Sequence, residues 1–112
     1  MKLIDKSITA RELQKMAENG FGNLVKAVVD IEKEVMAVDG SLHADEEAFL
    51  LKNGSSQKNL WGVNLYPELT GDDFIEFDSM INIRPRQKNL TRGVDDLNTQ
   101  NKIKKIINKL IK

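Results

Sequence analysis

Polar and apolar residues recur along this chain with two different periods, one typical of helices and one typical of strands. Three stretches have the helical period: residues 9–19, residues 43–51, and a last stretch that begins at Asp95 or Asp96. At the first of them, Thr9 and Glu12 have the spacing of a capping box, in which each side chain accepts a hydrogen bond from the other residue's backbone. The last stretch carries its apolar residues at i, i+3, i+4 and i+7, namely Ile103, Ile106, Ile107 and Leu110.

Strict alternation, with a period of two, predicts four strands: residues 26–32, 34–38, 60–66 and 74–84. Only a residue or two separates the first pair, so we expect an antiparallel hairpin there. The last strand should end at Pro85, because proline has no N–H to donate to a ladder. Its core face is predicted to consist of Ile75, Phe77, Ser79, Ile81 and Ile83.

Taken together, these elements predict an α+β fold. We expect one antiparallel sheet of about four strands with three helices, in the order α-β-β-α-β-β-α, and with the helices mainly on one face. The length of 112 residues fits one domain, spanning residues 1–112, with one modest hydrophobic core.

Composition narrows the class of protein. The chain has no cysteine, which excludes disulfides, thiolate metal sites and cysteine nucleophiles and fits a cytoplasmic protein. The first residues lack the apolar stretch of a signal peptide, and no window approaches the roughly 18 apolar residues of a membrane span. We therefore expect no membrane association.

The net charge of zero conceals an asymmetry between the two parts of the chain. Residues 1–83 contain 8 Lys/Arg and 15 Asp/Glu, a net charge of −7, whereas residues 84–112 contain 9 Lys/Arg and 2 Asp/Glu, a net charge of +7. The basic part is compatible with an anionic partner. The simpler interpretation is that the two parts complement each other, either within one molecule or between copies in a homo-oligomer. Nucleic acid is disfavoured as a partner because the carboxylates of the body would compete for the same cations.

The candidate binding residues follow from the last predicted strand and the segment after it. Glu76 and Asp78 are two residues apart, so both carboxylates would point to the same polar sheet face. Three arginine forks, suited to phosphate or carboxylate, follow closely. The predicted ligand- or partner-binding residues are Arg84, Arg86, Arg92, Glu76, Asp78 and Asn82. The alternative is that the face is only solvated and that the arginines pair with carboxylates of the same chain.

Catalytic candidates are few. His43 is the only histidine, so a multi-histidine metal site is excluded within one chain, and no metal or cofactor is predicted. His43 or Asp78 has the chemistry of a general base, although a histidine at a helix start is more often a cap or a packing contact. Phosphate-binding glycine loops, dinucleotide fingerprints, HExxH and GxSxG are all absent.

The runs LHADEE (42–47), LWGVNLYP (60–67) and EFDSMINIRP (76–85) resemble a family of short prokaryotic proteins known only as a domain of unknown function. The similarity spans nearly the whole chain. It implies one compact domain in a prokaryotic cytoplasm, and it transfers no catalytic residue.

Two hypotheses of function follow, and neither names a reaction. The favoured one is a non-enzymatic binding or interaction domain, in which residues 84–92 and the polar strand face hold a small anionic ligand or an acidic protein surface. The second is a small hydrolase or lyase, with His43 or Asp78 as base and Arg84 stabilising developing negative charge.

Overall fold

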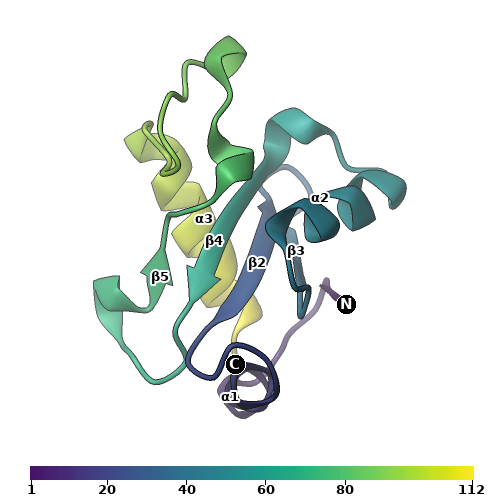
Figure 1. Ribbon diagram of the computed structural model, residues 1–112, viewed down its shortest axis with the longest axis vertical. Helices are drawn as coiled ribbons and strands as arrows, with labels where there is room; N and C mark the ends of the chain where they lie inside the picture. Colours follow the sequence, from purple (N-terminus) through teal and green to yellow (C-terminus); the bar gives the residue numbers. More distant parts are fainter.

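A computed structural model describes all residues, 1–112, and shows an α+β fold with one antiparallel sheet and three helices (Figure 1). The sheet has five strands in the order β1-β3-β2-β4-β5. The strands are β1 (Lys2–Ile4), β2 (Val25–Asp30), β3 (Val35–Val38), β4 (Leu60–Leu65) and β5 (Ile75–Glu76). The helices are α1 (Ala10–Asn19), α2 (His43–Lys52) and α3 (Leu97–Leu110).

The predicted fold class is confirmed, with two corrections to the sheet. It has five strands rather than about four, and the chain begins with a strand, so the order is β-α-β-β-α-β-β-α. The added strand, β1, is three residues long and pairs with β3 at the edge of the sheet. Three residues are too few to show an alternating pattern, so the sequence carried no signal for it.

The helix ends follow the predicted capping chemistry. At the start of α1, the Thr9 hydroxyl accepts a hydrogen bond from the Glu12 N–H at 3.0 Å, and a Glu12 carboxylate oxygen accepts one from the Thr9 N–H at 3.2 Å. At the start of α3, the carboxylate of Asp96 accepts from the Thr99 N–H at 3.0 Å. Both predicted helix starts are therefore confirmed, the second at Asp96.

The main hydrophobic core lies between one face of the sheet and helices α1 and α3. Alternate residues of β2 and β4 meet the apolar stripe of α3 and the buried side of α1; the buried set includes Ala27, Val29, Trp61, Val63, Leu13, Ala17, Ile103, Ile106, Ile107 and Leu110. The C-terminal end of the chain is joined to the segment before α1 by a parallel bridge between Ile111 and Ile8.

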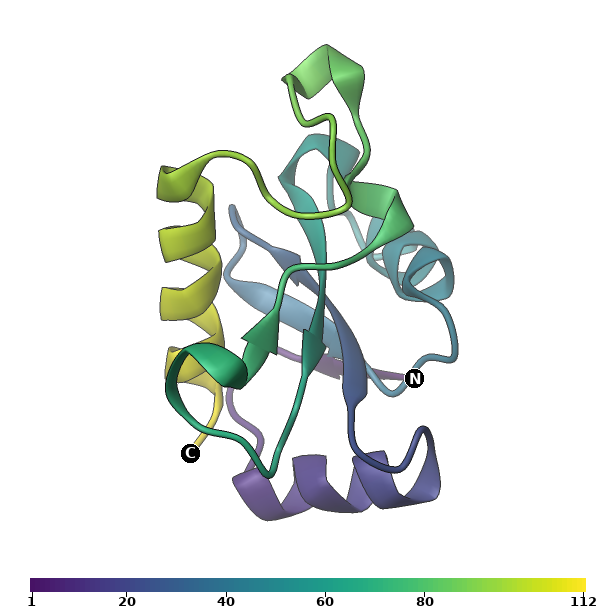
Figure 2. The same cartoon turned by 60° about the vertical axis from the view of Figure 1, so that its left-hand side comes forward.

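Helix α2 packs on the opposite face of the sheet, so two of the three helices, α1 and α3, share one face and the third covers the other. Figure 2 shows α2 and α3 on opposite sides of the strands. Under α2 lies a smaller apolar cluster of Val28, Ala37, Leu50 and Leu60, all buried. Strand β2 is consequently covered on both faces, except at Lys26, near the end of the sheet that α2 does not reach.

The strand predicted over 74–84 is wrong beyond its first residues. Only Ile75–Glu76 pair with β4, and the chain then forms short 3₁₀ turns at Met80–Asn82 and Pro85–Gln87. Ile83, assigned to the core, is 39% exposed. Residues 83–91 instead project beyond the end of the sheet as a loop, seen at the top of Figures 1 and 2, and Val94 returns to the main core.

Candidate functional site

A row of polar side chains crosses three strands on the face that carries α2. Lys26 of β2 lies opposite Asn64 of β4, and Asn64 lies opposite Glu76 of β5. Residues that are directly opposite each other in antiparallel strands place their side chains on the same face. Because α2 covers Val28 and Leu60 farther along the sheet, these three polar positions are left beside its N-terminus.

This row forms part of a cavity of about 520 Å³, which we call the His43 cavity. Its other walls come from the start of α2 and from the chain after β5. The lining residues are Leu24, Lys26, Leu42, His43, Ala44, Asn64, Tyr66, Glu76, Asp78, Ser79, Met80, Ile81 and Arg92. The structure therefore brings together four residues singled out from the sequence: His43, Glu76, Asp78 and Arg92.

Glu76 is the centre of a hydrogen-bond network in the cavity. Its Oε1 accepts from the Asn64 side-chain amide and from the Tyr66 hydroxyl, both at 2.9 Å. Burial and the bond to Glu76 raise the pKa of Tyr66, so the phenol remains a neutral donor at ordinary pH. The Oδ1 atom of Asn64 is buried and has no hydrogen-bond partner. A buried acceptor without a partner is unfavourable. Within the protein, no group donates a hydrogen bond to this oxygen.

His43 is held in one orientation by the backbone of β4. Its ring Nε2 lies 2.8 Å from the carbonyl oxygen of Val63, and since a carbonyl only accepts, Nε2 carries the proton. Burial lowers the pKa of His43 below its usual value, so the ring is neutral at pH 7. The lone pair is therefore on Nδ1, which forms no hydrogen bond within the protein.

Asp78 and Arg92 form an ion pair at the rim, with Arg92 Nε donating to Asp78 Oδ1 at 2.6 Å. Both side chains are about half exposed, so the pair contributes little to stability. The pair holds Arg92 beside the cavity that both residues line. The start of α2 lies on the other wall, and Leu42 at its N-cap provides no side-chain acceptor for the first backbone N–H groups.

Arg84 does not line this cavity. Its guanidinium stacks on the Trp61 ring, 4.2 Å from the ring centroid, and donates to the carbonyl oxygens of Gln57 and Leu60. A third bond, to the Gln87 side chain, is 3.0 Å long. Both terminal nitrogens of Arg84 thus donate within the fold, whereas its buried Nε has no partner. Arg86 is exposed and forms no ion pair.

Asn82 is also bonded within the fold, together with Asn89, which the sequence analysis did not single out. Asn82 is fully buried and bonds to both backbone groups of Gly62 and to the Arg92 carbonyl. The Asn89 amide donates to the carbonyls of Asn82 and Gly93, and its oxygen accepts from the Asp95 N–H. The two asparagines hold the ends of the projecting loop together.

Two cavity residues, Lys26 and Asn64, were not included in the predicted binding set. Their positions in the alternating patterns of residues 26–32 and 60–66 were the available signal. What the sequence did not contain was the pairing of the strands, which aligns Lys26 with Asn64 and Asn64 with Glu76.

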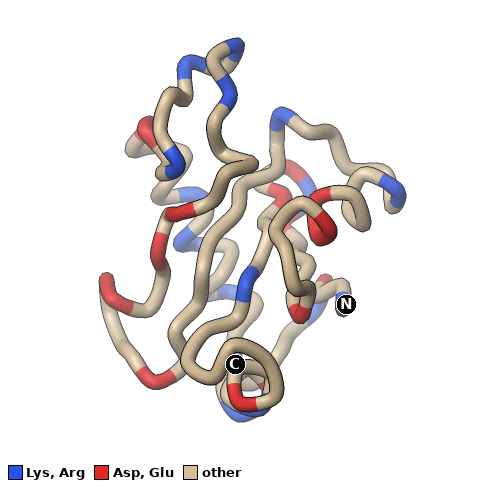
Figure 3. Tube along the Cα trace, viewed as in Figure 1, with Lys and Arg blue, Asp and Glu red and all other residues tan.

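The charge asymmetry is partly neutralised within the molecule. Three of the four ion pairs join the basic part of the chain to the acidic part: Arg92–Asp78, Lys104–Asp72 and Lys109–Glu34. Figure 3 shows basic residues on the projecting loop and acidic residues on β5 and the segment before it. All of these pairs are solvated, so they balance charge without adding much stability.

Two further features of the structure bear on its chemistry. No group of three or more histidine or acidic side chains is arranged to hold a metal ion. None of the helices combines the length and apolar character that crossing a bilayer requires.

Comparison with known proteins gives a family but no activity. No curated protein and no solved structure matches the chain. A family model described as "Protein of unknown function (DUF5674)" matches residues 2–110, which is nearly the whole chain. The protein therefore belongs to the DUF5674 family, for which no function is established.

Proposed function

We propose that this protein is a binding domain for a small molecule that carries an anionic group and a hydrogen-bond donor, and that the ligand occupies the His43 cavity. The observation that carries this proposal is the amide of Asn64, a residue of the cavity wall whose Oδ1 is a buried acceptor without a partner. The other polar atom of that amide, Nδ2, already donates to Glu76 Oε1. A donor on the ligand would complete the set.

The anionic group is supported by three positive features around the same cavity. Lys26 and Arg92 both line it, and the first turn of α2, from His43, presents backbone N–H groups that no side chain caps. The N-terminus of a helix favours negative charge. Neutral His43 adds an acceptor at Nδ1 without adding charge.

The carboxylates restrict which anions fit. Glu76 and Asp78 lie on the side of the cavity opposite α2, and Asp78 already pairs with Arg92. A multiply charged anion that filled the whole cavity would meet both carboxylates. A ligand with its anion toward Lys26 and α2, and with a hydroxyl, amide or ammonium toward Asn64 and Glu76, matches the charges on both sides.

The test is a thermal-shift screen followed by calorimetric titration. The screen uses phosphate, sugar phosphates, short carboxylates and amino acids as probes. A probe at a hundredfold excess over its Kd should stabilise the protein by about 2.7 kcal/mol. We expect Lys26→Met to weaken the binding of a probe that is found, whereas Lys105→Met, on the exposed side of α3, should not. Absence of any shift across the screen, or equal loss in the two variants, would overturn the proposal.

A second candidate function, a small hydrolase or lyase, is supported by the state of His43. A neutral imidazole with its tautomer set by a backbone carbonyl, and with its lone pair on the other nitrogen, is suited to act as a general base. In this version Arg92, not Arg84, is the cation near the substrate. The distinguishing experiment is turnover of the molecule identified by the screen: His43→Gln should abolish turnover while the molecule still binds.

A further inference from the structure

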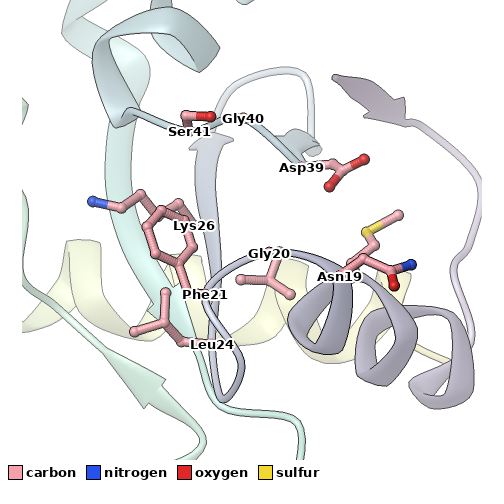
Figure 4. Close-up of a pocket in the computed structure, with 10 residues that line it drawn as sticks. Asn19, Gly20, Phe21, Leu24, Lys26, Asp39, Gly40 and Ser41 are labelled. Carbon is pink, nitrogen blue, oxygen red and sulfur yellow. The ribbon is translucent and has the colours of Figure 1, made fainter.

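A second cavity, of about 390 Å³, lies next to the first one, and we call it the Phe21 cavity. It is formed by the C-terminal end of α1, the loop that leads into β2, and the segment that follows β3. Figure 4 shows the side chains of Phe21, Leu24 and Lys26 on one side of it and Asp39 and Ser41 on the other. Apolar residues thus form one wall, and polar groups form its rim.

The two cavities share a wall. Leu24 and Lys26 line both of them, and no other residue does. Leu24 directly precedes β2, and Lys26 is the second residue of that strand. A molecule bound at Lys26 in the His43 cavity therefore needs to pass only these two side chains to enter the Phe21 cavity.

Phe21 is placed as a flat surface beside Lys26. Phe21 is 51% exposed, so its ring is open to contact by a bound molecule. The ammonium of Lys26 lies 5.2 Å from the ring centroid, within the range of a cation–π interaction. Gly22 follows with a φ of +97°, a conformation that strongly favours glycine and turns the loop back toward β2.

We propose that the ligand of the His43 cavity contains a planar aromatic group, which stacks on Phe21, linked to the anionic group, which binds at Lys26. The ligand class is thus an aromatic anion, such as a nucleoside monophosphate or an aryl phosphate. This inference rests on the proposed function above and makes it more specific. Lys26 would contact both parts of this ligand. Its ammonium would bind the anionic group on the His43 side of the shared wall, and it lies over the Phe21 ring on the other side.

The experiment compares matched pairs of probes by calorimetric titration: AMP with ribose 5-phosphate, and phenyl phosphate with methyl phosphate. We expect the aromatic member of at least one pair to bind about tenfold or more tightly, the range typical of a base stacked on an aromatic side chain. Phe21→Leu keeps an apolar side chain but removes the stacking surface. It should abolish the difference within the pair and leave the affinity for the non-aromatic member unchanged.

The outcomes separate this inference from the one on which it rests. If a non-aromatic anion binds but its aromatic counterpart gains nothing, or if Phe21→Leu weakens both members equally, the aromatic ligand is refuted and the His43 cavity stands. If no anion binds at all, both proposals fail. Because Phe21 is exposed, its replacement should leave the stability unchanged, and a thermal-unfolding curve of the variant checks this.

Discussion

The side chain of Asn82 pairs with the backbone of Gly62 as a neighbouring strand would. Its Nδ2 donates to the Gly62 carbonyl and its Oδ1 accepts from the Gly62 N–H, both at 2.9 Å. At Gly62, the backbone N–H and C=O on the free edge of β4 are therefore both hydrogen-bonded although no strand lies beside them. The absence of a side chain on Gly62 is also required, since a Cβ there would lie 2.6 Å from Ser79 Cβ.

Replacing Asn82 should be costly for this reason. Asn82→Ala leaves the buried N–H and C=O of Gly62 unpaired and also releases the Arg92 carbonyl, so we expect the free energy of unfolding to fall by roughly 2–4 kcal/mol. Urea denaturation measures this change. Asn101→Ala, at an exposed position of α3, is the control and should change stability by less than about 0.5 kcal/mol. A loss as small as the control's would contradict the strand-like role.

Arg84 and Arg86 should behave differently although they are two residues apart. Arg84→Lys removes the fork that holds two carbonyl oxygens and the stack on Trp61, and it should destabilise the fold by about 1–3 kcal/mol. Arg86→Lys, at an exposed position without an ion pair, should leave stability unchanged. Trp61 is the only tryptophan, so its fluorescence reports the loss of the stack directly. Similar stabilities for the two variants would show that Arg84 has no structural role.

His43 offers a direct test of the cavity's electrostatics. It is the only histidine, so its NMR titration is free of overlap, and burial should give it a pKa below the model-peptide value of about 6.5. With the folded pKa lowered, the unfolded chain binds the proton more readily. The contribution to stability is therefore complete above about pH 6.5 and is lost as the pH falls through the folded pKa. A pKa at or above 6.5, or a proton on Nδ1, would contradict the geometry described here.

Glu46 should make stability depend on pH in the opposite direction. It is a fully buried residue of α2, its Oε2 accepts from the Gly40 N–H at 2.9 Å, and burial raises its pKa to about 9. The folded state therefore holds a proton that the unfolded state loses near pH 4.5. The contribution of Glu46 is complete below about pH 4.5 and is lost as the pH rises toward 9, by at most about 1.4 kcal/mol per pH unit.

The variant Glu46→Gln removes this titration while it keeps an acceptor for Gly40. Its stability should exceed that of the natural protein by a margin that grows from pH 6 to pH 8, as followed by chemical denaturation at each pH. Asp45→Asn, an exposed position on the same helix, should leave the pH profile unchanged. Parallel profiles for the natural protein and Glu46→Gln would show that the carboxyl group is ionised when folded.

Local patterns were most informative where a segment's own residues determine its structure. The capping box at Thr9 and Glu12 placed α1, and the spacing of Ile103, Ile106 and Ile107 identified the buried side of α3. Alternation in the last predicted strand was misleading, because the same apolar residues also fit a chain in 3₁₀ turns. There the side chain of Asn82, rather than a strand backbone, forms the hydrogen bonds to β4. Of the predicted site residues, His43 and Asp78 line one cavity, whereas Arg84 and Asn82 are bonded within the fold.

The sequence by itself determined the helices, the first hairpin, β4 and the division of the chain into an acidic and a basic part. These depend on residues close together in the chain, where spacing and capping act directly. Only the tertiary structure decided that α2 covers the second face and that Lys26, Asn64 and Glu76 form a row beside His43. Strand pairing and helix placement depend on contacts between distant segments, and such contacts leave no periodic trace in the sequence of either segment.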